Sequence, residues 1–471
     1  MRINVPFGLH AYEDRSLAVN GQRLINFFAE KQPQDSKSAF VVNPTPGSAL
    51  WVSVGNGPIH GMKVMSDVLY VVSGNELYSV TTTAVTSLLG AIIGNTRVSM
   101  EHNGDQLCIV NGIKGYIYSG SSLTEITDTT FADPVRTIPD RVAYLEGRFI
   151  FNRPGFTEFF CSDSYNGLSY DSANFEFVRT SPENITSMIA DHGEVWLFCK
   201  YGTEVWVYNR NEAAFPYSRL DGSYVEKGCV APHSPAKIDN TFYWLGHDLC
   251  VYRADGYKPT RISTHAIEYH IKSYGDVSNA FGLTFVEQGH FFYEITFPDI
   301  ATWRYDTSTG VWHQARTGNS GRYHANATEF FANTNLVGDY RNGNIYSLSR
   351  DYYTDNGMTI YRTATTPHIH SGRLRAVMDR LDIDIKSGVG LTTGQGSDPQ
   401  LMLRYSDDGG NTWSAQRWAN MGRIGEYHRR VRFSQLGMFY QRMFEITISD
   451  PVDCVIIDAY ADVDIEDDYA R

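Results

Sequence analysis

The sequence predicts an all-β fold, in which a β-propeller-like array of about seven blades is followed by a C-terminal β-sandwich. The basic unit is clearest between Asp191 and Asn209, where two apolar runs, residues 195–199 and 204–208, flank a short polar link that contains Gly202. Both runs are rich in β-branched and aromatic residues, which suit a pleated and half-buried surface. A short glycine-containing link between two such runs is typical of an antiparallel hairpin.

The hairpin pattern recurs along most of the chain. Similar stretches begin at residues 69, 107, 149, 195, 242, 291 and 336, so that successive starts lie 38 to 49 residues apart. A repeat of this length built from short antiparallel strands indicates a β-propeller. Some units carry one more apolar run before the hairpin, such as residues 185–190, which gives at least three strands per unit. Because the spacing drifts, a large sandwich or a stack of hairpins with irregular links remains an alternative.

We expect three regions: an extended N-terminal arm over residues 1–56, the propeller-like domain over residues 57–355 and the sandwich over residues 356–471. The last region holds five or six segments in which apolar and polar residues alternate, a pattern typical of half-buried strands.

The predicted arm combines extended backbone with apolar side chains. Pro44 and Pro46 favour extended backbone in the residues before them. Phe27, Phe28 and Trp51 are too apolar to remain in water. The arm is therefore a candidate for a strand that closes the ring of this chain or of a neighbour.

One helix is predicted, over residues 264–274, with Ser263 as its N-cap. Its apolar residues recur at helical spacing, and it interrupts the array as an insertion on one rim. His265 and His270 are five residues apart and do not share a helix face, so they are expected to be ordinary surface or packing histidines rather than metal ligands.

Composition and charge exclude several classes of protein. The formal net charge is −13, and no dense cluster of Lys and Arg occurs, so we expect no sequence-specific binding of nucleic acid. A lumen through which DNA slides would tolerate this charge. No apolar run is long enough for a membrane span, and the first residues do not have the pattern of a secretory signal. The six cysteines form no CxxC pair and are expected to be buried free thiols.

The sharpest motif resembles the Asp-box, S-x-D-x-G-x-T-W, of sialidases and other propeller proteins. It is formed by Ser406, Asp408, Gly410, Thr412 and Trp413. The motif stabilises a hairpin, because its Ser and Asp side chains bond turn amides and its Gly permits positive φ. In sialidases it lies away from the chemistry. Here it occurs once and outside the array, so we interpret it as structural.

Signals of catalysis are otherwise missing from the sequence. It has no GxSxG elbow, Walker loop, HExxH or EF-hand loop, so we expect no enzyme activity, no metal and no cofactor. His368 and His370 share one face of a predicted strand, and an exposed face explains them more simply than a metal site. Asp382 and Asp384 likewise indicate a solvated edge rather than a catalytic dyad.

Six acidic residues crowd the segment 458–468. Asp462, Asp464, Asp467 and Asp468 are candidates for an interface with a basic partner or for a place near a DNA path. The alternative is a solvated edge strand whose charges block strand addition.

Several stretches in a fixed order resemble the packaged-DNA stabilisation proteins of short-tailed bacteriophages, which are tail accessory factors. The residues that carry the resemblance are NPTPGSALW at 43–51, RVSMEHNGDQLCIVNG at 97–112, RISTHAIE at 261–268 and GHFFY at 289–293. The resemblance implies a non-enzymatic virion tail protein, assembled in the host bacterial cytoplasm, that forms a six-copy hub ring. Such a ring closes the portal channel after packaging, connects the head-tail adaptor to the tail needle and the tailspike or receptor-binding protein, and opens for genome ejection. A phage-encoded carbohydrate-binding or sialidase-like propeller is the alternative.

Overall fold

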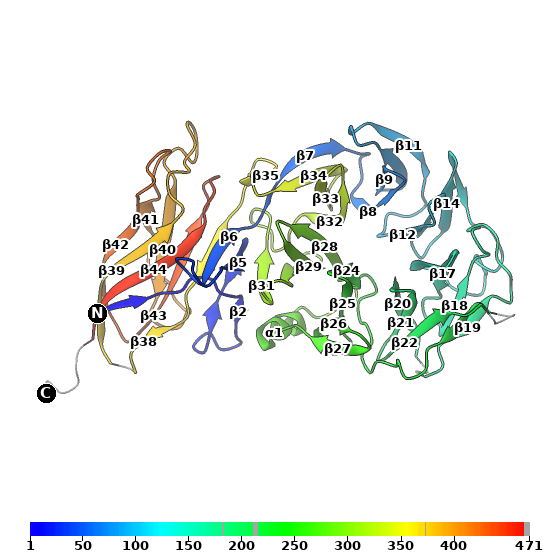
Figure 1. Cartoon of the computed structure of the whole chain (residues 1–471), viewed down its shortest axis with the longest axis horizontal. Coiled ribbons are helices and arrows are strands. Elements are labelled where there is room, and N and C mark those ends of the chain that lie inside the picture. Colours follow the sequence, from blue (N-terminus) through cyan, green and yellow to red (C-terminus); the bar gives the residue numbers. More distant parts are fainter. Residues whose placement is uncertain (181–182, 211–214, 373, 466–471) are drawn as a thin grey trace.

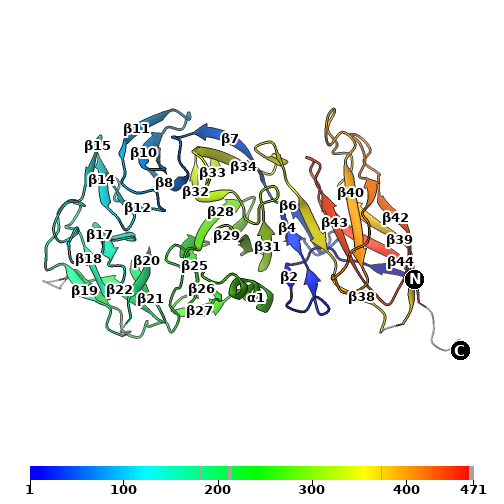
Figure 2. The ribbon, with the colours of Figure 1, turned by 180° about the vertical axis from the view of Figure 1, so that it is seen from behind.

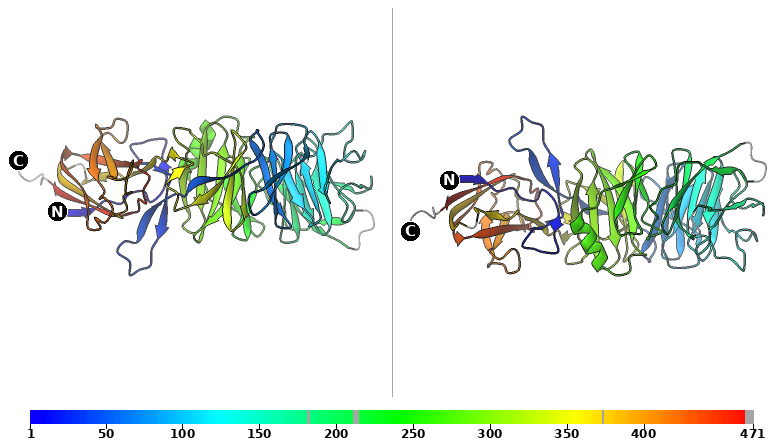
Figure 3. Two further views of the ribbon diagram at one scale, coloured as in Figure 1. Left: turned by 90° about the horizontal axis from the view of Figure 1, so that it is seen from above. Right: turned by 90° about the horizontal axis from the view of Figure 1, so that it is seen from below.

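A computed structural model describes residues 1–180, 183–210, 215–372 and 374–465. It shows a ring of small antiparallel sheets on one side and a two-sheet sandwich on the other (Figure 1). Viewed edge-on, the ring is a flat disc and the sandwich lies beside its rim, with the N-terminus at the far end of the sandwich (Figure 3). The predicted fold class, a propeller followed by a sandwich, is confirmed.

In the described part of the chain the ring consists of seven four-stranded blades, each counted outward from its innermost strand. The first four blades are β8 (Ile59–Met65), β9 (Val68–Ser73), β10 (Glu76–Val80) and β11 (Thr86–Ala91); β12 (Ser99–His102), β13 (Gln106–Val110), β14 (Gly115–Ser119) and β15 (Ser122–Glu125); β16 (Val142–Leu145), β17 (Arg148–Asn152), β18 (Glu158–Cys161) and β19 (Phe175–Phe177); and β20 (Ile185–Asp191), β21 (Glu194–Cys199), β22 (Thr203–Tyr208) and β23 (Tyr217–Arg219). The other three are β24 (Ala236–Ile238), β25 (Thr241–Leu245), β26 (Val251–Asp255) and β27 (Lys258–Arg261); β28 (Phe281–Glu287), β29 (His290–Phe297), β30 (Ala301–Asp306) and β31 (Val311–Ala315); and β32 (Ala325–Phe331), β33 (Thr334–Asp339) and β34 (Asn344–Ser349) with β7 (Gly47–Ser53).

The ring is closed by its own N-terminal segment. Strand β7 pairs antiparallel with β34, from Ser53 opposite Asn344 to Gly47 opposite Ser349. Blade 7 thus takes three strands from the end of the repeat array and its outermost strand from the beginning of the chain. This pairing decides between the two options for the predicted arm, because the strand closes the ring of the same chain.

Adjacent blades are held together by aromatic side chains. Between blades 4 and 5, Trp196 lies edge-on to Phe242 with ring centroids 4.9 Å apart, and Phe198 contacts Trp244 at 5.5 Å. All four rings are buried. A single blade cannot cover both of its own faces, so each cluster of this kind supplies the core that the next blade needs.

The sandwich packs two sheets face to face. One sheet has the order β42 (Val431–Phe439), β39 (Ala376–Ile385), β44 (Ile456–Ile465), β6 (Phe40–Pro44) and β5 (Phe27–Lys31), with β1 (Arg2–Asn4) also paired to β44. The other has the order β4 (Leu24–Ile25), β37 (Arg362–Thr365), β43 (Gln441–Ile448), β40 (Gln400–Ser406) and β41 (Arg417–Asn420), with β38 (Ile369–His370) on β43. Two short hairpins complete the chain, β2 (Tyr12–Glu13) with β3 (Gly21–Gln22) and β35 (Thr354–Asp355) with β36 (Met358–Thr359).

The propeller and the sandwich share one continuous core. A single cluster of buried residues contains Leu24 and Phe27 of the N-terminal segment, Trp303 and Trp312 of blade 6, and Ile446 of the sandwich. Strand β4 lies between β31 of blade 6 and β37 of the sandwich and pairs with both. The segment 1–56 therefore contributes strands to both domains.

The single helix of the described residues, α1 (His265–Ser273), follows blade 5 and buries Ala266, Ile267 and Ile271. Its N-cap is Thr264, whose hydroxyl accepts a hydrogen bond from the amide of Ile267, so the prediction of Ser263 as the cap is wrong by one residue. No helix in the described ranges has the length and apolarity that crossing a bilayer requires. All six cysteines are buried and unpaired, as predicted.

The packing between blades 4 and 5 gives a test of the repeat. Trp196 is 4% exposed, and replacing a buried aromatic with Ala leaves a cavity that typically costs about 3–5 kcal/mol. We expect Trp196→Ala to lower the denaturant midpoint accordingly. The matched control is Trp418→Ala, because Trp418 is 58% exposed and its loss should change stability by less than about 0.5 kcal/mol. Equal midpoints for the two variants would contradict the blade packing.

Candidate functional site

The Asp-box folds as a tight turn after β40. The Ser406 hydroxyl donates to Asp408 Oδ1 and accepts a hydrogen bond from the amide of Gly410, both at 2.7 Å. Asp408 also accepts from the amide of Thr412 at 2.9 Å and from its hydroxyl at 2.6 Å. These hydrogen bonds, those from Thr412 first, lower the pKa of Asp408 to about 2. The carboxylate is therefore committed to holding the turn.

Trp413 packs against this turn. The Cζ2 atom of its ring lies 3.9 Å from the position that a Cβ atom on Gly410 would occupy, and Gly410 has a φ of 95°. The guanidinium of Arg404 lies 4.8 Å from the centre of the same ring. The structure thus brings the five motif residues together in a packed turn.

A neighbouring ion pair, not predicted from the sequence, anchors the same turn to the sandwich. Arg442, which is 1% exposed, donates to both carboxylate oxygens of Asp407 at 2.7 and 2.8 Å. Its guanidinium also lies 4.1 Å from the ring centre of Tyr405 and donates to the carbonyl of Leu436 at 2.6 Å. Two parallel hydrogen bonds of this kind fix the relative orientation of the two side chains as well as pairing their charges.

The acidic strand β44 lies inside a sheet, so its prediction as a solvated edge is wrong. β44 pairs with β39, with β6 and with β1. Asp462 forms an ion pair with Arg380, while Asp464 lies 3.6 Å from the N-terminal ammonium group with a side chain that is 90% exposed. Alternation alone could not show these neighbours. Asp467 and Asp468 lie outside the described residues, and the role of the acidic residues in an interface stays a prediction.

Asp382 is also not on a solvated edge. It lies on β39, between β42 and β44, and is 5% exposed. Arg432 donates to it at 2.7 Å, and Arg380 and Arg2 lie 3.5 and 3.7 Å from it. This group of arginines around one carboxylate ties β1, β39 and β42 together and has the character of a structural ion-pair network.

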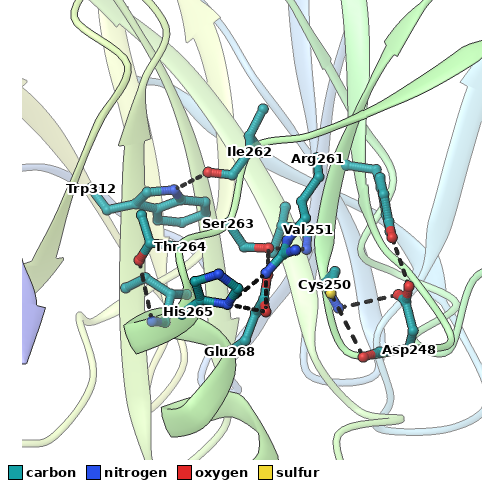
Figure 4. Close-up of polar contacts among 12 residues, drawn as sticks. Asp248, Cys250, Val251, Arg261, Ile262, Ser263, Thr264, His265, Glu268 and Trp312 are labelled. Carbon is teal, nitrogen blue, oxygen red and sulfur yellow. Dashed lines mark hydrogen bonds and ion pairs between the residues drawn. The ribbon is translucent and has the colours of Figure 1, made fainter. Parts of the chain in front are cut away.

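The segment 261–268, which carried part of the family resemblance, anchors α1 to blade 5 (Figure 4). The buried carboxylate of Glu268 accepts hydrogen bonds from Arg261 at 2.5 Å and from Ser263 at 2.7 Å. Ser263 in turn accepts from the amide of Val251 at 3.0 Å, and Trp312 donates to the carbonyl of Ile262 at 2.8 Å. The polar groups described here are hydrogen-bonded to one another. The residues of this segment are therefore explained by their role in holding the helix on the blade.

One histidine from each pair noted in the sequence contacts a backbone carbonyl. His368 donates to the carbonyl of Leu17 at 2.8 Å, and His270 contacts the carbonyl of Glu13 at 3.1 Å. Among residues 1–180, 183–210, 215–372 and 374–465, no group of three or more His, Cys, Asp or Glu side chains is placed to hold a metal ion.

The innermost strands of the seven blades surround the axis of the ring (Figures 1 and 2), and an axial channel lies between their side chains. Its cavity has a volume of about 410 Å³ and is lined by residues from all seven inner strands and from the segments that lead into them. Lys63 forms an ion pair with Glu101 at 2.9 Å inside it. Burial raises the pKa of Glu329 to about 7, although Lys63 opposes this shift. The channel is thus polar and narrow.

At the end of the channel where the inner strands begin, the charge is positive. Arg97, Arg141 and Arg322 are brought together there from three different connections. Burial and repulsion from Arg322 and Arg141 lower the pKa of Arg97 to about 9. No local pattern in the sequence marks this cluster, because the three residues are far apart along the chain and each stands in a different local context.

The Asp-box predicts a pH-dependent local stability. Because the pKa of Asp408 falls from 3.8 to about 2 on folding, its stabilising effect is present above about pH 4 and is lost as the pH falls through about 2. Hydrogen exchange should show the amides of Gly410 and Thr412 protected at neutral pH and released over this window. Asp408→Ala should release them at neutral pH with no change in the blades, and unchanged protection would contradict the role of Asp408.

Comparison with known proteins gives matches to two family profiles. Residues 1–353 match the profile described as Bacteriophage P22 Gp10, beta-propeller, and residues 361–464 match Bacteriophage P22 Gp10, beta-sandwich. A search of curated proteins finds no significant match.

Solved structures are similar only at low identity. Streptogramin B lyase is 10% identical with a TM-score of 0.43, over 64% of this chain and 97% of that chain. PorZ of Porphyromonas gingivalis is 14% identical with a TM-score of 0.37, over 80% of this chain and 46% of that chain. The extracellular domain of BT4673 from B. thetaiotaomicron is 12% identical with a TM-score of 0.44, over 87% of this chain and 59% of that chain. These scores are too low to carry a functional argument.

The two family matches follow each other in the order in which the structure places the propeller and the sandwich. Together they span both domains, and the first alone covers more than half of the chain. This chain therefore belongs to the bacteriophage P22 Gp10 family.

Proposed function

We propose that six copies of this chain form the hub ring of a short phage tail, below the portal and the head-tail adaptor. In this role the ring closes the DNA channel after packaging, connects the adaptor to the needle and the tailspikes, and opens for genome ejection. The observation that carries the proposal is the family match over both domains, which identifies a structural protein of a phage tail. The six copies and the partners come from the family resemblance.

The dimensions of the propeller support a ring of several copies. Its axial channel encloses about 410 Å³, within the range of about 300–1,000 Å³ typical of a small-molecule pocket. Arg141 and His233 lie in its wall at one end. A DNA duplex, whose major groove alone is about 12 Å wide, does not fit through it. In the proposed ring, the passage for DNA therefore lies between copies of the chain and not along the axis of one propeller.

The joint between the domains supports a role in transmitting force. The core runs without interruption from blade 6 to the sandwich, and Asn26 links the two across it. The Asn26 amide donates to the carbonyls of Arg316, beyond blade 6, and of Tyr361, before the sandwich, at 3.0 and 2.9 Å. A connector between an adaptor and a needle needs such a rigid joint.

The overall charge suits a surface that DNA passes without adhering. The formal net charge is −13, and the acidic face of β44 adds Asp464 as an exposed carboxylate at the end of the sandwich. We keep Asp462 and Asp464 as a proposed docking surface for a basic partner. Because Asp462 is already paired with Arg380, Asp464 is the more accessible of the two.

A sialidase-like or carbohydrate-binding propeller is less well supported. A sialidase also needs a tyrosine–carboxylate nucleophile pair beside its arginines. The printed sequence has one Asp-box, and it holds a turn in the sandwich rather than in a blade. Among the described residues, the tyrosines that donate to a carboxylate lie on outer strands, in turns or in the sandwich, and not on an inner strand: these are Tyr78, Tyr252, Tyr257, Tyr346 and Tyr460.

The proposal is tested by counting copies in purified virions. Quantitative mass spectrometry against the major capsid protein should give about six copies per particle, and cryo-electron microscopy should place the propeller–sandwich fold in a ring on the tail axis. Particles assembled without the chain should lose packaged DNA, because nothing closes the channel. A copy number unrelated to six, or release of sugar from a glycan by the isolated protein, would contradict the hub role.

A further inference from the structure

The cationic end of the axial channel is formed by side chains that reach across several blades. Arg97, which precedes blade 2, donates to Asn326 of blade 7 at 2.8 Å, and Asn326 donates to the carbonyl of Ile59 in blade 1 at 2.7 Å. Arg141, which precedes blade 3, donates through Nε to the carbonyl of Pro232, which precedes blade 5, at 2.7 Å. These contacts fix two guanidinium groups over the channel rather than on the outer rim.

An aromatic ring holds the cluster together. The guanidinium of Arg97 lies 3.6 Å from the ring centre of Phe281, and that of Arg322 lies 5.5 Å from the same centre. Phe281 is the first residue of the inner strand of blade 6 and is buried. A cation over the face of a ring is attracted by the ring quadrupole, which orients both arginines without neutralising either charge.

The positive charge at this end has no carboxylate in direct contact. Within the described ranges, Arg97, Arg141 and Arg322 form no ion pair with an Asp or Glu side chain. Burial lowers the pKa of Arg141 to about 10, although Asp140 opposes this shift. Burial, and then repulsion from Arg141 and Arg97, also lowers the pKa of His233.

The carboxylates that act on Arg322 do so from a distance. Burial lowers its pKa, and the attraction of Tyr340, Glu294, Asp299 and Asp339 opposes the shift without restoring the ordinary value. His60, on the inner strand of blade 1, also has a lowered pKa because it is buried, and Arg97 adds to this effect. Burial is thus the first cause of the lowered pKa of each of these basic groups, and the neighbouring carboxylates do not offset it.

One donor in the cluster has no partner among the residues that the structure describes. Arg141 is 5% exposed, and its Nη2 forms no hydrogen bond in the structure. The other two nitrogens of this guanidinium donate to the carbonyls of Pro232 and Asp140. An unsatisfied buried donor on a charged group is costly, and an anion in the adjoining cavity would satisfy it. Arg141 also lines the cavity of about 410 Å³ that continues along the axis.

We propose that this end of the channel binds a small phosphate-type oxyanion between Arg97, Arg141 and Arg322. A guanidinium donates two parallel hydrogen bonds to an oxyanion, and phosphate offers oxygens in several directions at once. The three arginines approach from the connections before blades 2, 3 and 7, so a tetrahedral anion matches them better than a planar carboxylate. The inference does not rest on the proposed hub role, because it concerns the axis of one propeller and not the lumen between copies.

The test is a titration of the purified full-length chain with inorganic phosphate, in buffers whose ionic strength is held constant with sodium chloride. We expect saturable binding by calorimetry and a rise in the melting temperature that follows phosphate concentration. Arg97→Gln should weaken binding at least tenfold. The matched control is Arg350→Gln, because Arg350 also lies over an aromatic ring, that of Phe28, and donates only to Gln288 and Asn43. That variant should bind phosphate as the wild type does.

A second variant keeps the test decisive if Arg97→Gln does not fold. Arg97→Lys retains the charge but loses the paired donors of the guanidinium. Its affinity for phosphate should therefore be lower than that of the wild type but higher than that of a variant without a charge at position 97. Binding of a 5′-phosphorylated dinucleotide is compared with binding of the same dinucleotide without the 5′-phosphate. This comparison shows whether the site accepts a phosphate that is part of nucleic acid or only free phosphate. Binding of either phosphate that depends on Arg97 supports the site. No binding beyond the effect of chloride, or equal binding by wild type and Arg97 variants, would overturn it.

Discussion

The pairing of β7 with β34 is the constraint on which the rest of the structure depends. The chain runs first through strands of the sandwich, crosses to blade 7 as β7 and then runs around the whole ring to β34. After blade 7 it crosses back through β37 into the sandwich (Figure 2). The two domains are therefore joined by two segments of chain at the same place. Neither domain is complete without residues from the first 56 positions.

The same route explains why the core does not divide at the domain boundary. Strand β4 bridges blade 6 and the sandwich, and Gly47 packs so closely that a side chain there would lie 2.3 Å from the carbonyl oxygen of Tyr352. Asn26 adopts a φ of 54° between them, which its short polar side chain tolerates while bonding to both sides. The result is a rigid unit with a disc at one end and a sandwich at the other, as the proposed connecting role requires.

What could be predicted from the sequence was local in character. The hairpins, the alternating strands, the helix and the Asp-box turn each depend on residues a few positions apart, and the structure shows all of them. Alternation along β44 predicts that Ala459, Ala461, Val463 and Ile465 share one face, and the first three are buried, whereas Ile465 at the end of the strand is 36% exposed. It could not show that β39 and β1 lie beside that strand. The alternation of side chains shows which face of a strand is buried, but not which strands pair with it. The arginines at 97, 141 and 322 meet only after the ring has closed, so no local pattern marks them.

Hydrogen exchange along β7 tests the central claim that the N-terminal strand completes the propeller. If β7 pairs with β34 as described, peptides covering residues 47–53 and 344–349 should be protected to a similar degree in the full-length chain. Gly47→Val, which forces a side chain against the carbonyls of Tyr352 and Thr354, should release both peptides together, whereas Ser53→Ala at the exposed end should release neither. Rapid exchange of residues 47–53 in the wild type, with residues 344–349 still protected, would contradict the account.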